Sequence, residues 1–188
     1  GKLRYWDDPV VQKANPNVHL PHMPIIAVHR SDGSGTTYNF TYYLSQVDPN
    51  FKKQVGVDVM VAWPGAYSIG AKGNAGVASQ VQTIPGAIGY VEYAYAQNNG
   101  MTTARMVNQA GQVVTPNAAS FASAASHAAW KASDDYKLIL SNQPGAGSWP
   151  MVATTFILVP TDSLVYNRIA AFFMWAFKQG GPDAMKLA

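Results

Sequence analysis

The sequence contains no cysteine and no long hydrophobic run, and charged residues make up only 12% of its 188 residues. The absence of cysteine excludes disulfide bonds and thiol chemistry, and it is compatible with an oxidising compartment. No apolar stretch approaches the length of a membrane span, and residues 1–4 do not lead into a signal-peptide core. The 13 Lys and Arg residues form no run and barely exceed the 10 Asp and Glu residues, so we expect no nucleic-acid partner. Because 48% of the residues are hydrophobic, the composition predicts a globular chain with a sizeable core.

Residue groups typical of metal or nucleotide sites are also scarce. His19 and His22 are spaced as H-x-x-H, but Pro21 disfavours a helix that would align them, and neither cysteine nor carboxylate lies nearby. Residues 65–72 come near a nucleotide-binding P-loop, but Ala71 stands where lysine should follow the second glycine. We therefore expect neither a metal nor a cofactor.

The sequence does contain a short aliphatic run that leads through a polar turn into a helix. Residues 25–29 predict a buried strand, and from Ser34 onward apolar residues recur at helical spacing: Phe40, Tyr43, Leu44 and Val47. We call residues 30–36 (RSDGSGT) the signature turn. It places Ser34, Gly35 and Thr36 at a helix start, where backbone N–H groups lack intrahelical partners and the helix dipole favours an anion.

The residue types of the signature turn suit a small oxyanion. Its glycines let backbone amides approach a ligand closely, and Ser34 and Thr36 can add hydroxyl donors. Arg30 offers a planar charged fork that matches a tetrahedral oxyanion. Asp32 would repel an anion, so we expect it to hold the Arg30 guanidinium or to cap the turn.

Two other interpretations of the turn stay open at this point. In the first, Ser34 is an ordinary helix N-cap and Arg30 a surface charge. In the second, Ser34 is the nucleophile of a hydrolase, because a serine in a strand-to-helix turn is typical of the nucleophile elbow. That motif needs glycines two positions on either side, where this sequence has Asp32 and Thr36, and no acid and histidine partners can be assigned.

The signature turn closely resembles the signature of the periplasmic phosphate-binding proteins that serve ABC-type phosphate importers. Four further segments resemble the same family and follow its order along the chain: residues 2–8, 73–77, 85–96, and 149–150 with 154–158. The resemblance therefore covers nearly the whole sequence.

This resemblance implies a function of binding without chemistry. Inorganic phosphate would be bound by Arg30, Ser34, Gly35 and Thr36, with Asp32 orienting the arginine. The resemblance also implies delivery of phosphate to the permease subunits of an ABC importer. The expected location is the periplasm, or the cell exterior as in lipid-anchored relatives.

The resemblance assigns this sequence to the second of the family's two lobes. The phosphate ligands that the family takes from its first lobe, including an aspartate that accepts the phosphate proton, have no counterpart here. We therefore expect a fragment that depends on a missing first-lobe polypeptide or on a neighbouring copy.

Alternating strand and helix patterns without repeats predict an α/β fold. With the resemblance, the expected architecture is one lobe of a two-lobed type II periplasmic binding protein, with a helix-flanked mixed sheet in three α/β/α layers. Residues 1–159 are predicted as the second lobe, lacking its opening segment. Residues 160–188 are predicted as a helical segment that would pack on the missing first lobe. Asp162 or Ser163 would cap its helix, whose apolar face comprises Val165, Ile169, Phe172, Phe173, Ala176 and Phe177.

Local patterns predict the remaining elements. Helices are expected at residues 9–14, 48–53, 74–84 and 118–130, and a short helix or turn at 93–98. Strands are expected at 57–63, 87–91 and 152–159, a hairpin at 103–115, and a glycine-rich loop at 65–73. Asn74 is predicted as the N-cap of its helix. The resemblance also places that helix start at the ligand cleft, so Asn74 is a candidate for supporting the phosphate ligands.

Overall fold

The computed structural model describes residues 3–65 and 67–181. The chain divides into two compact units, residues 1–153 and 154–188, which are described separately. Lys2 of the family-like segment, Ala66 of the predicted glycine-rich loop, and residues 182–188 of the predicted C-terminal segment lie outside the described residues.

The first unit is built on a three-stranded parallel sheet. Its strands are β1 (Ile26–Arg30), β2 (Ser68–Ala71) and β3 (Ala87–Gly89), in the order β2-β1-β3. Val28, at the centre of β1, lies opposite Ile69 on one side and Gly89 on the other. The aliphatic run predicted as a strand therefore forms the central strand, one residue further along than expected.

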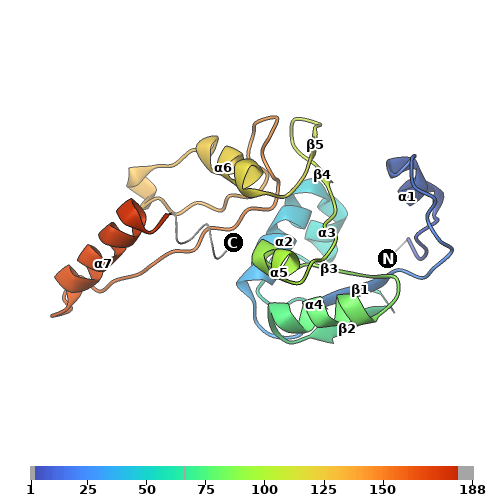
Figure 1. Ribbon diagram of the computed structural model, residues 1–188, viewed down its shortest axis with the longest axis horizontal. Coiled ribbons are helices and arrows are strands. Elements are labelled where there is room, and N and C mark those ends of the chain that lie inside the picture. Colours follow the sequence, from blue (N-terminus) through green and yellow to red (C-terminus); the bar gives the residue numbers. More distant parts are fainter. Residues whose placement is uncertain (1–2, 66, 182–188) are drawn as a thin grey trace. The chain divides into compact units, whose positions relative to one another are not determined.

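A helix follows each strand at its carboxyl end: α2 (Gly35–Val47), α4 (Gly73–Thr83) and α5 (Tyr93–Asn98). Figure 1 shows α4 running alongside the strands. On that face of the sheet, buried Val28 packs with Ala71 and with Val77 of α4. The closeness of the packing is clear at Gly89, where a Cβ atom would lie 2.9 Å from a Val77 methyl group.

The opposite face of the sheet is covered by aromatic rings. Because side chains alternate along a strand, His29 points away from α4, and its ring stacks on Trp63. Phe40 of α2 contacts both Trp63 and the ring of Tyr90, which follows β3. The sheet thus has α4 on one face and α2, through this ring cluster, on the other, as expected for an α/β/α lobe.

The other elements of the first unit are short. They are α1 (Pro9–Ala14), α3 (Pro49–Gln54), the antiparallel pair β4 (Met106–Val107) and β5 (Val113–Val114), α6 (Ala118–Ser126) and the 3-10 turn η1 (Ala132–Asp134). Asp8 caps α1 and Asp48 caps α3, each directly before a proline that suits the first helical turn. A capping box formed by Asn117 and Ser120 starts α6, which ends four residues earlier than predicted.

Several sequence predictions are wrong in detail. Residues 65–73, predicted as a loop, contain β2, whose strand conformation depends on pairing with β1. Residues 57–63 form no strand. Two of their carbonyls accept hydrogen bonds from α2 and its N-cap instead: the Ser34 amide donates to Val59 O at 2.9 Å, and the Thr41 hydroxyl to Asp58 O at 3.3 Å. The expected mixed sheet is wholly parallel, and the antiparallel pairing is found in the separate hairpin.

The second unit consists of an extended segment followed by α7 (Tyr166–Gln179). Residues 152–159, predicted as a strand, form none, and Leu158 is 88% exposed. The helix begins later than predicted, since Ser163 does not cap it but accepts a hydrogen bond from the Val165 amide in the preceding turn. Phe172 contacts Phe173 and Trp175, and Phe177 is 76% exposed, so much of the apolar face is uncovered within this unit. No helix among the described residues is long and apolar enough to cross a membrane.

Gly86 joins the N-terminal segment to the sheet. Its carbonyl accepts hydrogen bonds from the Trp6 indole at 2.9 Å and from the Ile26 amide at 3.2 Å. Its φ is +79°, and a Cβ atom there would clash with the Pro24 carbonyl oxygen. Both the backbone conformation and the close approach therefore require glycine at this position.

We predict that Gly86→Ala destabilises the protein much more than Gly111→Ala. Both glycines have positive φ, which costs an L-residue about 1–2 kcal/mol. A Cβ at Gly111 meets nothing within 4 Å, so only Gly86→Ala adds a backbone clash. Urea unfolding of both variants measures the difference, and equal losses of unfolding free energy would contradict it.

Candidate anion-binding site

The signature turn connects the carboxyl end of β1 to the first turn of α2. Ser34 is the N-cap of α2, and its Oγ accepts a hydrogen bond from the Thr37 amide at 3.2 Å. The Ser34 amide is used by Val59 O, and the residue is only 4% exposed. The next two amides, of Gly35 and Thr36, donate to no protein acceptor among the described residues. They are the donors that a helix N-terminus leaves open.

Arg30 ends β1 and is paired with Asp32, the contact expected from the sequence. Its Nε donates to Oδ1 at 2.8 Å and its Nη2 to Oδ2 at 2.7 Å, a bidentate geometry. These bonds use two of the five guanidinium N–H donors. The Arg30 side chain is 10% exposed, yet no buried side-chain nitrogen or oxygen of the described residues lacks a partner. Nη1, for which no hydrogen bond is found within the described part of the chain, is therefore not fully buried.

The electrostatics of the pair keep both groups charged. The hydrogen bond from Arg30, and then that from the Gly73 amide, hold the pKa of Asp32 well below its usual range. The hydrogen bond to Asp32 in turn raises the pKa of Arg30, against the opposing effect of burial. At neutral pH the pair is a fixed, oriented ion pair.

Asp32 also occupies the N-terminus of α4. Its Oδ1 accepts a hydrogen bond from the Gly73 amide at 3.1 Å, across 41 positions of sequence. Two helix N-termini therefore meet at this edge of the sheet, and one of them already has a carboxylate as its anion. The N-terminus of α2 has no such partner, so it is the one that can take an external anion.

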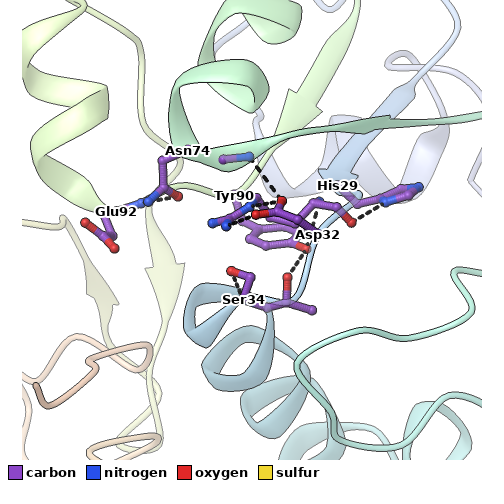
Figure 2. A network of polar contacts seen from close by, with 9 residues as sticks. His29, Asp32, Ser34, Asn74, Tyr90 and Glu92 are labelled. Atoms are coloured by element: carbon purple, nitrogen blue, oxygen red, sulfur yellow. Dashed lines mark hydrogen bonds and ion pairs between the residues drawn. The ribbon is translucent and has the colours of Figure 1, made fainter. Parts of the chain in front are cut away.

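Asn74 does not cap α4 as predicted. Lys72 stands at the N-cap position without a side-chain hydrogen bond, because Asp32 supplies the acceptor from another loop. Asn74 lies within the first turn, where its Oδ1 accepts the Glu92 amide at 3.4 Å. Figure 2 shows Asn74 and Glu92 together beside the network that contains Asp32 and Tyr90. Asn74 thus links the start of α4 to the residue before α5.

Sequence reasoning missed Tyr90. Its hydroxyl accepts a hydrogen bond from the Arg30 amide at 3.2 Å and shares a second, at 2.8 Å, with Thr37 Oγ1. The local pattern treats residues 87–91 as buried strand and gives no reason to single out this hydroxyl. A usable signal was present: Tyr90 directly follows a parallel strand, and ligand sites in such sheets lie at the carboxyl ends of strands.

The arrangement gives no support to a hydrolase. Ser34 Oγ caps α2, and His29, the histidine nearest in sequence, is turned to the ring cluster. His29 Nδ1 hydrogen-bonds the carbonyl of Arg30 at 3.0 Å rather than a serine. No group of three or more His, Asp or Glu residues that could hold a metal ion occurs among residues 3–65 and 67–181.

The fold is a parallel α/β sheet with open amide donors and a paired arginine at its carboxyl edge. Residues 1–179 match the family model described as the PBP superfamily domain, and the chain belongs to that family of periplasmic-binding-protein-like domains.

Several relatives of this chain are named phosphate-binding protein PstS. The chain is 48% identical over 190 residues to the protein of that name from Xylella fastidiosa (strain Temecula1) and 45% identical to that from Pasteurella multocida, with 100% of the chain covered in each case. It is 38% identical to the protein from Methanocaldococcus jannaschii, with 85% of the chain covered. The matches cover 52%, 55% and 44% of these relatives, so the chain spans about half their length.

We predict that Asp32→Asn lowers the unfolding midpoint at neutral pH. Because the pKa of Asp32 is depressed in the folded state, its contribution is full above the unfolded carboxyl pKa of about 4. It is lost as pH falls toward the folded pKa, so the gap between wild type and variant should narrow in that acid range. Thermal unfolding at a series of pH values measures the gap.

Asp135→Asn is the matched control. Asp135 pairs with Lys137 at 3.0 Å, but both side chains are largely exposed, so the change should leave the midpoint nearly unaltered. An Asp32→Asn gap that does not vary with pH would contradict the assignment.

Proposed function

We propose that this chain binds inorganic phosphate through Arg30, Ser34, Gly35 and Thr36, as part of a solute-binding protein of an ABC-type phosphate importer. The observation that carries the proposal is the pair of open amides at the start of α2 beside an arginine that Asp32 holds in place. Relatives named phosphate-binding protein PstS support the choice of phosphate.

In this proposal each group has a distinct part. The Gly35 and Thr36 amides donate to phosphate oxygens, and the dipole of α2 favours the negative charge. Arg30 contributes its N–H donors that are not used by Asp32. The Ser34 hydroxyl accepts from Thr37 through its oxygen, so its own proton remains to be donated to the ligand.

The site binds its ligand without chemistry, and the proposed partners are those of a transport component. Phosphate would be passed to the permease subunits of the importer, in the periplasm or at the cell exterior by way of a lipid-anchored form. The exposed apolar face of α7 would pack on a first-lobe polypeptide or on a neighbouring copy of the chain. Asn74 would support the site indirectly, through the backbone before α5.

Titration calorimetry of the purified chain with inorganic phosphate, beside a phosphate-ester turnover assay, tests the proposal. Binding without turnover is the expected result. Turnover that is lost in Ser34→Ala would favour the hydrolase instead.

Arg30→Ala should weaken phosphate binding more than Ser34→Ala. Loss of a charged donor costs about 1.5–3 kcal/mol, or about 10- to 150-fold in affinity, whereas loss of one neutral hydrogen bond costs about 1 kcal/mol, or about fivefold. Arg105→Ala, which removes an exposed arginine ahead of β4, should leave the affinity unchanged. Equal losses in Arg30→Ala and Ser34→Ala would count against the assigned roles.

Phosphate should have little advantage over sulfate in this chain. At pH 8 both are mainly dianions of similar shape, and they differ in that phosphate carries a proton to donate. The groups assigned to the ligand are donors, and the Asp32 oxygens already accept from Arg30 and Gly73. We expect dissociation constants within about tenfold of each other. A competition titration that gives a strong phosphate preference would overturn this assignment.

A further inference from the structure

Tyr90 forms hydrogen bonds at both ends of the signature turn. Its hydroxyl accepts the amide of Arg30, the last residue of β1, and hydrogen-bonds the hydroxyl of Thr37, the third residue of α2. One phenol oxygen therefore holds a backbone group before the turn and a side chain after it. Figure 2 shows Tyr90 in the same polar network as Asp32 and Ser34.

The ring that carries this hydroxyl is held firmly. Its centroid lies 4.4 Å from that of Phe40, with the two planes only 20° apart, and 5.7 Å from that of Trp63. Phe40 belongs to α2, and Trp63 also stacks on His29 of β1. The ring is therefore packed directly against α2, and it is linked to β1 through Trp63, so its hydroxyl is a fixed point relative to both elements.

Within the turn, the backbone is held by contacts to other loops. The Ser31 amide donates to Ala71 O, the Ser34 amide to Val59 O, and Asp32 pairs with Arg30 and the Gly73 amide. None of these contacts joins β1 directly to α2, and a Cβ atom added at Gly33 or Gly35 would meet nothing within 4 Å. The Tyr90 hydroxyl does join them, and a binding constellation must be held within about 0.5 Å of its productive geometry.

We infer that Tyr90 is a positioning residue of the anion site. Its hydroxyl fixes the end of β1 against the start of α2, so it sets the affinity for phosphate without contacting the ligand. This inference rests on the proposed phosphate-binding function. It assigns the phenol ring to the aromatic core and the hydroxyl to the site.

Tyr90→Phe keeps the ring and removes the hydroxyl. Calorimetry with inorganic phosphate should show affinity reduced by about five- to tenfold, as expected for a lost hydrogen-bond network of this size. The amide resonance of Arg30 in a nitrogen–proton NMR spectrum of the ligand-free chain should shift as well, because it loses its acceptor. Tyr43→Phe, which removes a hydroxyl from the later part of α2, should change neither quantity.

The partner residue gives a second route to the same test. Thr37→Val removes the hydrogen bond to Tyr90 and should weaken phosphate binding, whereas Thr37→Ser keeps a hydroxyl and should restore most of the affinity. The double variant Tyr90→Phe, Thr37→Val should lose less affinity than the product of the single losses, because the two residues share one bond. A residue that acts through general stability alone would show additive losses and no rescue by serine.

The outcomes separate the two proposals. If the unaltered chain binds phosphate and Tyr90→Phe binds equally well, the positioning role is overturned and the proposed function stands. If the unaltered chain binds no phosphate, the proposed function fails and the inference fails with it. Should Tyr90→Phe not fold, the Thr37 pair of variants decides the question.

Discussion

The site depends on how the Asp32 carboxylate is shared. It accepts two hydrogen bonds from Arg30 and one from the Gly73 amide at the start of α4. Without Asp32, the region would present a loose arginine and two open helix N-termini. With it, the N-terminus of α4 is satisfied internally and the arginine is held in one orientation, while the first amides of α2 stay open. In the proposed site, a carboxylate that would repel an anion if it faced one instead orients the arginine.

The strand order explains why these groups meet. In the order β2-β1-β3, α2 lies on the ring-cluster face and α4 on the opposite face, so the chain leaves β1 and β2 in different directions. A crevice forms outside the carboxyl ends of the strands where such a reversal occurs, and ligands of open α/β sheets bind there. Arg30 and Tyr90 stand at the ends of the neighbouring strands β1 and β3, directly at this point.

What could be predicted from sequence was local. The aliphatic run at residues 25–29, the N-cap Ser34 and the helix after it carry their signals within a few residues, and the structure contains all three. The errors lie where partners are distant. Residues 68–71 become a strand by pairing with β1, whereas residues 57–63 form none and instead give carbonyl acceptors to α2 and its N-cap. Asn74 does not cap α4, because the acceptor for the Gly73 amide is supplied by Asp32, which lies 41 positions earlier in the sequence.

The groups assigned to binding and the groups assigned to positioning differ in the same way: the first have a local sequence signal and the second depend on distant partners. Backbone amides carry no sequence signature of their own, so a site built on them is recognised by the turn that exposes them, as residues 30–36 are. Amides cannot adjust their positions as side chains can, and their geometry is only as good as the contacts that hold the backbone. Such contacts join residues that are far apart in the sequence: Asp32 hydrogen-bonds to Gly73, and Tyr90 hydrogen-bonds to Arg30 and Thr37. An anion site of this kind therefore needs a firm scaffold as much as it needs donors, and in the proposed site the aromatic cluster around Tyr90 and the Asp32 ion pair would provide it.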